Sequence, residues 1–246
     1  MLFLASDAPF YTSASIVNAA DSQGGLAPNT IVTIYGTGLA FTTRAITADD
    51  IKEGMLPTVL PNTGVRVSVG GILANIYYVS PGQINLLVPA LLSPGTSYVQ
   101  VFLDGRAGPQ VSLPLGAVSP ALFQLDSQNA VAARVDGSVV TPDNPAHPGD
   151  IAILYATGLG ATVPPAVYGT VAPAAAVLKD MASFQLVLDG TPLDPSLVLY
   201  AGAAPGFAGL YQINCVLPTS TGASPEIRIG VAAQLSKTGV TLPVKP

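Results

Sequence analysis

The sequence predicts an all-β protein built from two tandem immunoglobulin-like β-sandwich domains. Two observations predict this fold: a duplicated series of short alternating segments, and breaker residues spread evenly among them. The chain has 246 residues, of which 25 are Gly and 23 are Pro. Such frequent breakers oppose long helices. Short alternating segments with turn signals about ten residues apart are typical of two-sheet sandwiches.

The first landmark of the duplication is a strand that ends in a glycine bend. Residues 28–39 (PNTIVTIYGTGL) and 148–159 (PGDIAILYATGL) share it at an offset of 120. The second landmark is Gln-Ile-Asn, which begins at Gln83 and again at Gln212, an offset of 129. Nine extra residues therefore lie between the two landmarks of the second copy.

Each copy repeats further strands in the same order. Residues 65–71 and 184–190 alternate and then reach Gly-Gly or Asp-Gly, pairs that favour two-residue hairpin turns. Residues 98–103 and 227–231 follow as strands of period two. The repeated order indicates two copies of one sandwich.

The boundary between the copies is expected near residues 116–120. We therefore divide the chain into an N-terminal extension or arm (1–13), a first sandwich (14–117) and a second sandwich (118–246). The second copy opens with a hairpin whose arms are 122–125 and 131–135.

Two stretches interrupt the strand pattern, and we expect one helical turn in each. The first is 47–54, where Thr47 is a suitable N-cap and acidic residues follow. The second is 172–178, which is rich in Ala.

Composition excludes several classes of partner. Charged residues make up 9% of the chain, against roughly 25% in ordinary soluble domains. With a net charge of −5 and nine Lys plus Arg, no basic stripe is present to bind nucleic acid. No apolar run approaches the ~18 to 20 residues of a transmembrane helix. An uncharged surface is common in secreted β-proteins and in subunits packed against neighbours, so we expect an extracellular or cell-surface protein.

We predict no catalytic, cofactor-binding or metal-ligating residue, no cofactor, and no enzymatic activity. The single His147 lies in a loop, at the position that Ala27 occupies in the first copy, and no Gly-x-Ser-x-Gly elbow accompanies it. Cys215 takes the place of Leu86, which indicates a buried, inert thiol. A single cysteine also excludes an internal disulfide.

Other polar residues have a structural and a functional interpretation. Asp49, Asp50 and Glu53 suit a helix N-terminus better than a calcium site, and Asp189 and Asp194 suit turns better than a metal site. The glycines of 36–38 and 158–160 favour strand-end bends over a phosphate loop. Paired carboxylates for glycoside hydrolysis would be brought together only by the fold, and no sequence feature marks them.

The repeated Gln-Ile-Asn is the one polar feature present in both copies. We expect its amides to bond loop backbone within each sandwich, with ligand recognition as the alternative. An aromatic platform for polysaccharide would need tyrosines, for which core or sheet-edge positions are the simpler interpretation; these are Tyr77, Tyr78, Tyr168 and Tyr200.

Ordered motifs over residues 14–244 resemble a known family. They include SIVNAA at 15–20, YVSPGQIN at 78–85, YATGLG at 155–160 and APGF at 204–207. This pattern is similar to the uncharacterised C-terminal domain family of secreted acidobacterial (Solibacter-type) proteins, and each half resembles an IPT/TIG immunoglobulin-like sandwich. The resemblance implies a fold and export, and it implies no reaction. Because that domain normally ends a longer protein, we expect this nearly isolated copy to be a free-standing subunit.

The leading functional hypothesis is a non-enzymatic structural protein of the cell exterior that binds itself. Assembly would occur through the apolar N-terminal arm, Met1 to Tyr11, which would add as a strand to the sheet of a neighbouring molecule. The arm could instead fold back on its own domain, or derive from a secretion signal. The alternative is an extracellular binding or adhesion module for carbohydrate or a surface protein, with loops as its binding surface.

Overall fold

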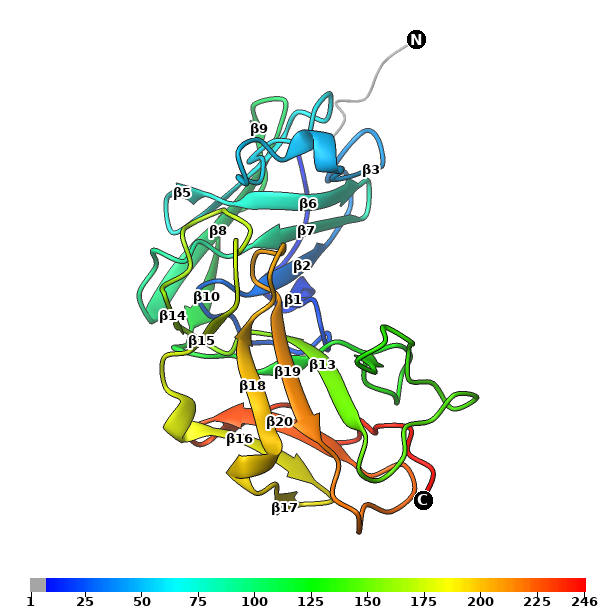
Figure 1. Ribbon diagram of the computed structural model, residues 1–246. Coiled ribbons are helices and arrows are strands. Elements are labelled where there is room, and N and C mark those ends of the chain that lie inside the picture. The colour runs from blue at the N-terminus through cyan, green and yellow to red at the C-terminus, as the bar shows by residue number, and fades with distance from the viewer. Residues whose placement is uncertain (1–7) are drawn as a thin grey trace.

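The protein consists of two antiparallel β-sandwiches, stacked one above the other in the computed structural model, which describes residues 8–246 (Figure 1). The helices among these residues are four single 3-10 turns: η1 (Ser13–Ser15), η2 (Ala48–Asp50), η3 (Met181–Ser183) and η4 (Pro195–Leu197). The prediction of an all-β fold with two immunoglobulin-like sandwiches is confirmed. None of the helices in residues 8–246 has the length and apolar character needed to span a membrane.

The first sandwich packs two five-stranded sheets against each other. The sheet nearer the viewer in Figure 1 has the order β1-β2-β7-β6-β3 and contains β1 (Ile16–Asn18), β2 (Ile31–Tyr35), β7 (Gln83–Leu87), β6 (Asn75–Ser80) and β3 (Arg44–Ala45). The second sheet has the order β10-β8-β4-β5 with β9 beside β8, and contains β10 (Val111–Leu115), β8 (Gly95–Leu103), β4 (Val65–Val69), β5 (Ile72–Leu73) and β9 (Arg106–Ala107).

The second sandwich repeats this plan with a seven-stranded and a four-stranded sheet. The larger sheet has the order β11-β13-β19-β18-β15-β14 with β12 beside β13, and contains β11 (Ala121–Leu122), β12 (Ala132–Ala133), β13 (Ile151–Thr157), β19 (Tyr211–Val216), β18 (Val198–Ala203), β15 (Ala176–Leu178) and β14 (Thr162–Val163). The smaller sheet has the order β17-β16-β20-β21 and contains β17 (Thr191–Pro192), β16 (Phe184–Leu188), β20 (Ile227–Val231) and β21 (Gln234–Leu235).

Each sandwich has its own apolar core, because alternate residues of its strands point inward. In β4, Val65, Val67 and Val69 are buried, whereas Arg66 is exposed. One cluster of buried side chains lies within residues 11–115, and a second lies within 122–244. Burying a Val, Leu or Ile contributes about 1.5–3 kcal/mol, so each cluster stabilises its own sandwich. The predicted boundary between domains stays a proposal.

The predictions of local secondary structure are confirmed with one exception. Residues 47–54 contain the helical turn η2, and the hairpin after residue 121 forms and adds β11 and β12 to the larger sheet. The predicted helical turn at 172–178 is wrong, because Ala176–Leu178 is the strand β15, paired with β14 and β18. Its Ala-rich composition favours helix, but pairing on both edges outweighs this weak propensity.

The described part of the predicted N-terminal arm folds onto its own sandwich. Phe10 bonds the backbone of Thr37 in both directions, at 3.0 and 2.9 Å. Tyr11 is 3% exposed; its hydroxyl donates to the Pro109 carbonyl at 2.5 Å and accepts from the Val101 N–H at 2.8 Å. Tyr11 is therefore a core residue. The arm's Leu2, Phe3 and Leu4 lie outside the described residues.

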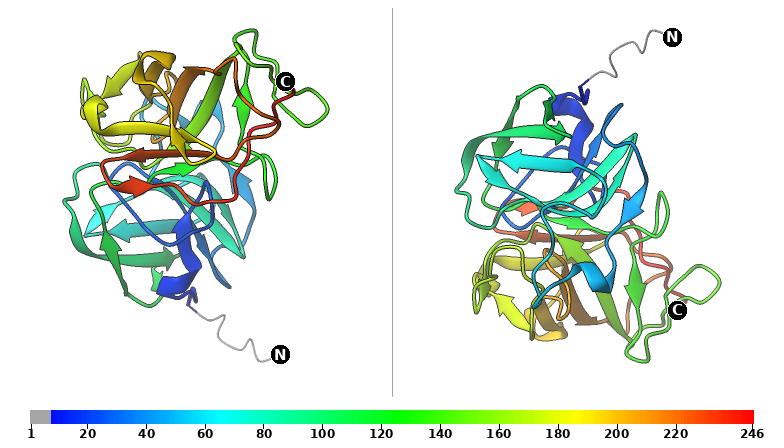
Figure 2. Two further views of the ribbon diagram at one scale, coloured as in Figure 1. Left: turned by 90° about the horizontal axis from the view of Figure 1, so that it is seen from below. Right: turned by 90° about the horizontal axis from the view of Figure 1, so that it is seen from above.

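The two sandwiches share a packed interface. The turn before β19 and the loop around residue 170, both from the second sandwich, lie against the front sheet of the first in Figures 1 and 2. Leu56, Leu87 and Ala208 form a buried apolar cluster there. The Tyr77 hydroxyl donates to the Ala208 carbonyl at 2.6 Å, and the Leu56 N–H donates to the Gly169 carbonyl at 2.8 Å.

The interface has a residue at which only glycine fits. Gly209 has φ +66°, and an added Cβ would lie 2.3 Å from Leu87 Cδ1. We expect Gly209→Ala to loosen the interface, which faster hydrogen exchange at residues 54–57 and 168–171 would report. Gly206→Ala is the matched control, because Gly206 also has positive φ (+82°) but an added Cβ has nothing within 4 Å. Equal effects of the two changes would mean that backbone strain alone acts.

Candidate functional site

Four residues of identical type recur on the outer face of the front sheet in each sandwich. In the first domain they are Tyr35, Gln83, Asn85 and Tyr78, and in the second domain Tyr155, Gln212, Asn214 and Tyr200. We call each set a quartet. Residues of a strand alternate between faces. Ile84 lies between Gln83 and Asn85, Ile213 lies between Gln212 and Asn214, and both isoleucines are buried in a core. The amides therefore lie on the opposite, outer face of the sheet.

Strand register fixes how each quartet is arranged. Tyr35 lies opposite Gln83, and Tyr78 lies opposite Asn85. In the second domain Tyr155 lies opposite Gln212, and Tyr200 opposite Asn214. A β-bulge of one residue precedes the second tyrosine in both copies, at Tyr77 and Leu199. The bulge shifts the tyrosine onto the same face as the amides.

The two amides of each quartet bond each other. Gln83 Nε2 donates to Asn85 Oδ1 at 2.8 Å, and Gln212 Nε2 donates to Asn214 Oδ1 at the same distance. The expected bonds from these amides to loop backbone are not formed with the loops that the structure describes, because the side chains lie within the sheet. Among residues 8–246, no hydrogen bond uses the glutamine Oε1 or the asparagine Nδ2. Each pair therefore presents one acceptor and one donor group.

The quartets differ in how open they are. Tyr35 is 44% exposed, and no protein hydrogen bond within residues 8–246 involves the hydroxyl of Tyr35 or Tyr78. In the second domain the Tyr200 hydroxyl donates to the Ala203 carbonyl at 2.6 Å and accepts from the Ala176 N–H at 3.1 Å. Strand β15 thus engages Tyr200, whereas the first-domain quartet has both hydroxyls available.

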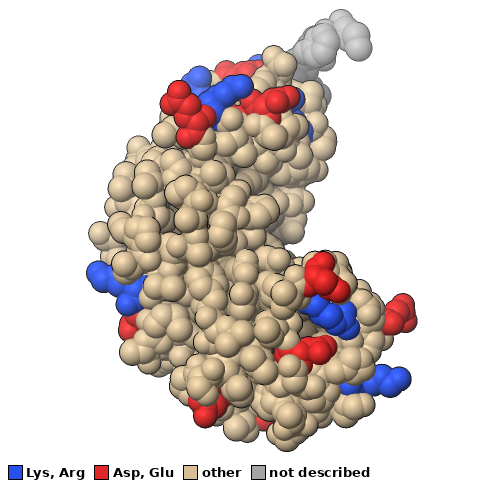
Figure 3. All heavy atoms as spheres, viewed as in Figure 1, with Lys and Arg blue, Asp and Glu red and all other residues tan. Residues whose placement is uncertain are grey.

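The molecular face that carries the quartets has few charges. Figure 1 looks onto the front sheet of the first domain and onto the sheet of β13, β18 and β19 in the second. Figure 3 shows the same face, with its charged side chains at the two ends and along the rims and uncharged residues across the middle. Its surface presents amides, hydroxyls and aromatic rings in place of ions.

The four tyrosines considered for a polysaccharide platform do not form one surface. Tyr77 is engaged at the domain interface, where burial raises its pKa, and the Tyr168 hydroxyl donates to the Leu73 carbonyl across the same interface. Tyr78 and Tyr200 belong to different quartets. Sequence reasoning missed Tyr35 as a member of the same outer face as Tyr78, although Tyr35 and Tyr155 align in the repeat.

His147 is exposed in its loop, as predicted. Its ring Nδ1 lies 2.7 Å from the Lys245 carbonyl oxygen, and its backbone N–H donates to the Asp150 carboxylate at 2.8 Å. Cys215 is buried in the second core, and burial raises the pKa of its thiol to about 12.

Cys215 should therefore resist modification in the folded protein. Because the thiolate is the reactive species, we expect no labelling by Ellman's reagent at pH 8 under native conditions and one equivalent in denaturant. Rapid native labelling would contradict the buried position of the thiol.

The acidic residues serve turns and caps. Asp50 accepts from the Thr47 N–H at 2.9 Å and from Arg44 Nη2 at 2.7 and 2.9 Å. The Thr47 backbone bond, and after it the Arg44 bonds, lower the pKa of Asp50. Asp189 occupies a left-handed turn position (φ 47°), and Asp194 caps η4 by accepting from the Ser196 N–H. Within residues 8–246 no three His, Cys, Asp or Glu side chains gather as a metal site would require.

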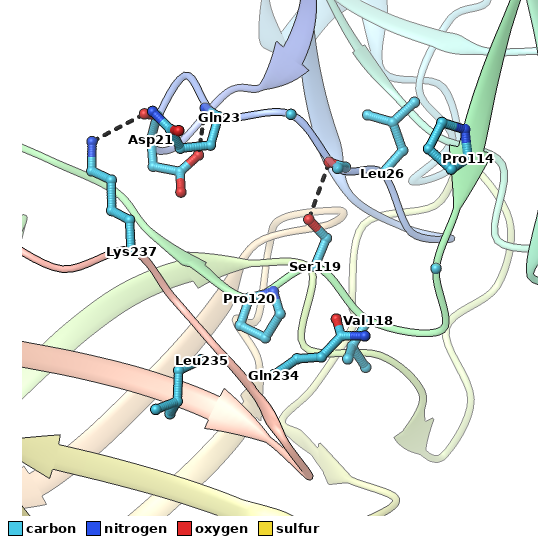
Figure 4. A pocket seen from close by; sticks show the side chains of 13 residues that line it. Asp21, Gln23, Leu26, Pro114, Val118, Ser119, Pro120, Gln234, Leu235 and Lys237 are labelled. Carbon is cyan, nitrogen blue, oxygen red and sulfur yellow. Dashed lines mark hydrogen bonds between the residues drawn. The ribbon is translucent and has the colours of Figure 1, made fainter.

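A cavity of about 390 Å³ lies at the seam between the domains (Figure 4). One wall carries Asp21, Gln23 and Lys237, and an apolar wall includes Leu26 and Pro114. The Lys237 ammonium donates to the backbone carbonyl of Asp21 at 3.0 Å, so the lysine joins the second domain to the first.

The Asp21 side chain is buried, and it forms no ion pair with any of residues 8–246. The residue is 8% exposed, and its Oδ1 accepts from the Gln23 N–H at 2.9 Å. Burial raises the pKa of the carboxyl, and the Gln23 bond and the Lys237 charge oppose the rise. A raised pKa means that this group stabilises the fold in acid and loses that contribution as the pH rises through its folded pKa.

Removing the Asp21 charge should stabilise the protein near neutral pH. We expect Asp21→Asn to raise the Tm at pH 7, because Asn keeps an acceptor for the Gln23 N–H and removes a poorly solvated charge. The gain should vanish at about pH 3, where the carboxyl is protonated in both the folded and the unfolded protein. A lower Tm at pH 7 would show that Asp21 is held for stability.

Comparison with known proteins found one matching family and several remote structural neighbours. Residues 15–116 match the IPT/TIG domain family. No curated protein matches the chain. The mixed-linkage glucan protein SGBP-B of Bacteroides ovatus is 12% identical with a TM-score of 0.34, covering 90% of this chain and 42% of its own. Domains 5-6 of the S-layer protein SbsC are 10% identical with a TM-score of 0.29, covering 96% and 98%.

A third solved structure has comparable values. The surface glycan-binding protein PbSGBP-B of Prevotella bryantii is 10% identical with a TM-score of 0.29, covering 96% of this chain and 42% of its own. The chain thus spans less than half the length of either SGBP-B protein.

Proposed function

We propose that this protein is a non-catalytic binding module of the cell exterior that holds a neutral carbohydrate on the outer face of its first domain. The observation that carries the proposal is the first-domain quartet, in which unused amide groups lie beside two tyrosines with available hydroxyls on an uncharged face. The resemblance to a secreted acidobacterial family supports export.

The chemistry of the quartet matches that of a sugar. A sugar ring offers hydroxyls that both donate and accept, together with an apolar C–H face. The Asn85 Nδ2 can donate to a hydroxyl and the Gln83 Oε1 can accept from one. Tyrosine contributes an apolar ring with a polar tip, which suits a ligand of mixed character. A face without charges favours a neutral ligand over an ionic one.

The self-assembly hypothesis has less support from the described residues. Strand addition by the arm would need residues that are free of their own domain, and Phe10 and Tyr11 are engaged there.

The test is a screen of the labelled protein on an array of neutral oligosaccharides, followed by titration calorimetry with the strongest hit. We expect the double variant Tyr35→Ala, Gln83→Ala to bind roughly tenfold or more weakly, because it loses one ring contact and one amide contact. The matched control is Tyr155→Ala, Gln212→Ala, the same change in the less open quartet, and it should bind as the wild type does. Both variants remove surface side chains, so circular dichroism should show intact folds.

Two results would reject the proposal. One is an array without neutral-glycan hits. The other is equal binding by the wild type and the first-domain variant. Strong loss only in the second-domain variant would also reject it, because the binding face would then lie on the other sandwich.

A further inference from the structure

The seam cavity has the construction of a small-molecule site separate from the outer face. Its lining comes from both domains: the first contributes Asp21 and Leu26, and the second contributes Gln234, Leu235 and Lys237. Its volume of about 390 Å³ falls within the ~300–1,000 Å³ that is usual for ligand pockets.

The polar wall holds unused hydrogen-bonding capacity. Among residues 8–246, the Asp21 carboxylate accepts one bond, at Oδ1, from the Gln23 N–H. The Lys237 ammonium has three protons, and its one hydrogen bond within the described part of the chain goes to the Asp21 backbone carbonyl. Figure 4 shows both side chains on the same side of the cavity, with Gln23 beside them. Burying a carboxylate that accepts only one hydrogen bond costs free energy, and a ligand that donates further hydrogen bonds would reduce that cost.

These two groups select the ligand by its charge. A cation would be attracted by Asp21 and repelled by Lys237, and an anion would meet the reverse. A hydroxyl suits both, because it can donate to the carboxylate and accept from the ammonium at once. Two adjacent hydroxyls could each donate a hydrogen bond to one of the two carboxylate oxygens of Asp21.

The apolar lining residues suit the carbon skeleton of the same ligand. Leu26 and Pro114 lie together on the first-domain side of the cavity, Leu235 lies apart from them on the second-domain side (Figure 4), and none of the lining residues is aromatic. A compact ring that carries both C–H groups and hydroxyls could contact these apolar residues and the polar groups together.

We propose that the seam cavity binds a neutral vicinal diol of monosaccharide size, with Asp21 accepting from its hydroxyls and Lys237 donating to them. Sugars and acyclic polyols share this chemistry. This site does not depend on the outer-face proposal, because the two share no residue.

The experiment is titration calorimetry of the whole protein with glucose, galactose and mannose in one arm and with sorbitol in the other. We expect saturable binding in at least the sugar arm, and a ring preference would separate sugars from open-chain polyols. Asp21→Asn should weaken binding roughly tenfold or more, because a charged hydrogen bond is lost. Lys237→Met should also weaken it. Lys179→Met removes an exposed ammonium that does not line the cavity, so it should change nothing.

The result for Asp21→Asn distinguishes binding from a structural role. The variant should be more heat-stable than the wild type at pH 7 and yet bind more weakly, a combination that general destabilisation cannot produce. Equal affinity of Asp21→Asn and the wild type, or the absence of saturable binding in both arms, would overturn the proposal. The Tyr35→Ala, Gln83→Ala variant should bind these small ligands normally, so the two proposals fail or stand separately.

Discussion

Replacing Ile84 by Ala should lower the free energy of unfolding of the first domain by about 2–5 kcal/mol, because a fully buried side chain leaves a cavity in a packed core. Ile84, in β7, is 0% exposed. Ile213 holds the equivalent place in the second core, also at 0% exposure, and Ile213→Ala should have an effect of the same size. Urea denaturation followed by tyrosine fluorescence measures both.

The pair of variants also reports on the interface. If the sandwiches are held together as Leu56, Leu87 and Ala208 indicate, destabilising one core should broaden the transition without separating it fully from the other. Two well-resolved transitions in the wild type would contradict an energetically important interface. A loss under 1 kcal/mol in either variant would contradict the buried position of that isoleucine.

Gly158→Ala should destabilise the second domain by on the order of 3 kcal/mol, since strained backbone alone costs about 1–3 kcal/mol. Gly158 has φ +76°, and an added Cβ would lie 1.9 Å from the Ser119 carbonyl oxygen, so the chain entering the second domain would have to move. Thermal denaturation at pH 7 measures the loss.

Gly149→Ala is the matched control for this prediction. Gly149 also has positive φ (+90°), but an added Cβ has nothing within 4 Å. Its cost should be limited to the backbone strain of an alanine in the left-handed region. Equal losses of stability in the two variants would show that the Ser119 backbone moves away at little cost and that its contact with the added Cβ does not matter.

The fold could be predicted from the sequence because the periodic patterns that indicate strands and turns are local. The alternation in β4 and the Gly-Gly and Asp-Gly turns each depend on a few neighbouring residues, and the same signals recur in the second copy. At 172–178 the local signal failed, because the pairing partners of Ala176 and Val177 are Ala203 and Gly202, about 25 residues away.

The candidate sites needed contacts that no spacing reveals. Gln83 and Asn85 could be recognised as a repeated pair, but their placement on an outer face beside Tyr35 and Tyr78 depends on strand register and on a bulge. Asp21 and Lys237 are 216 residues apart in sequence, and neither stood out in the sequence. Only the packing of the two sandwiches brings them to one cavity.

The most direct test of the binding face is a nuclear magnetic resonance titration of the ¹⁵N-labelled protein with the neutral oligosaccharide selected on the array. We predict that the largest shifts are those of the side-chain amide groups of Gln83 and Asn85, with backbone shifts along β2, β6 and β7. Shifts centred on β4 and β8, on the opposite sheet of the same domain, or the absence of any saturable shift, would contradict a carbohydrate site on the outer face.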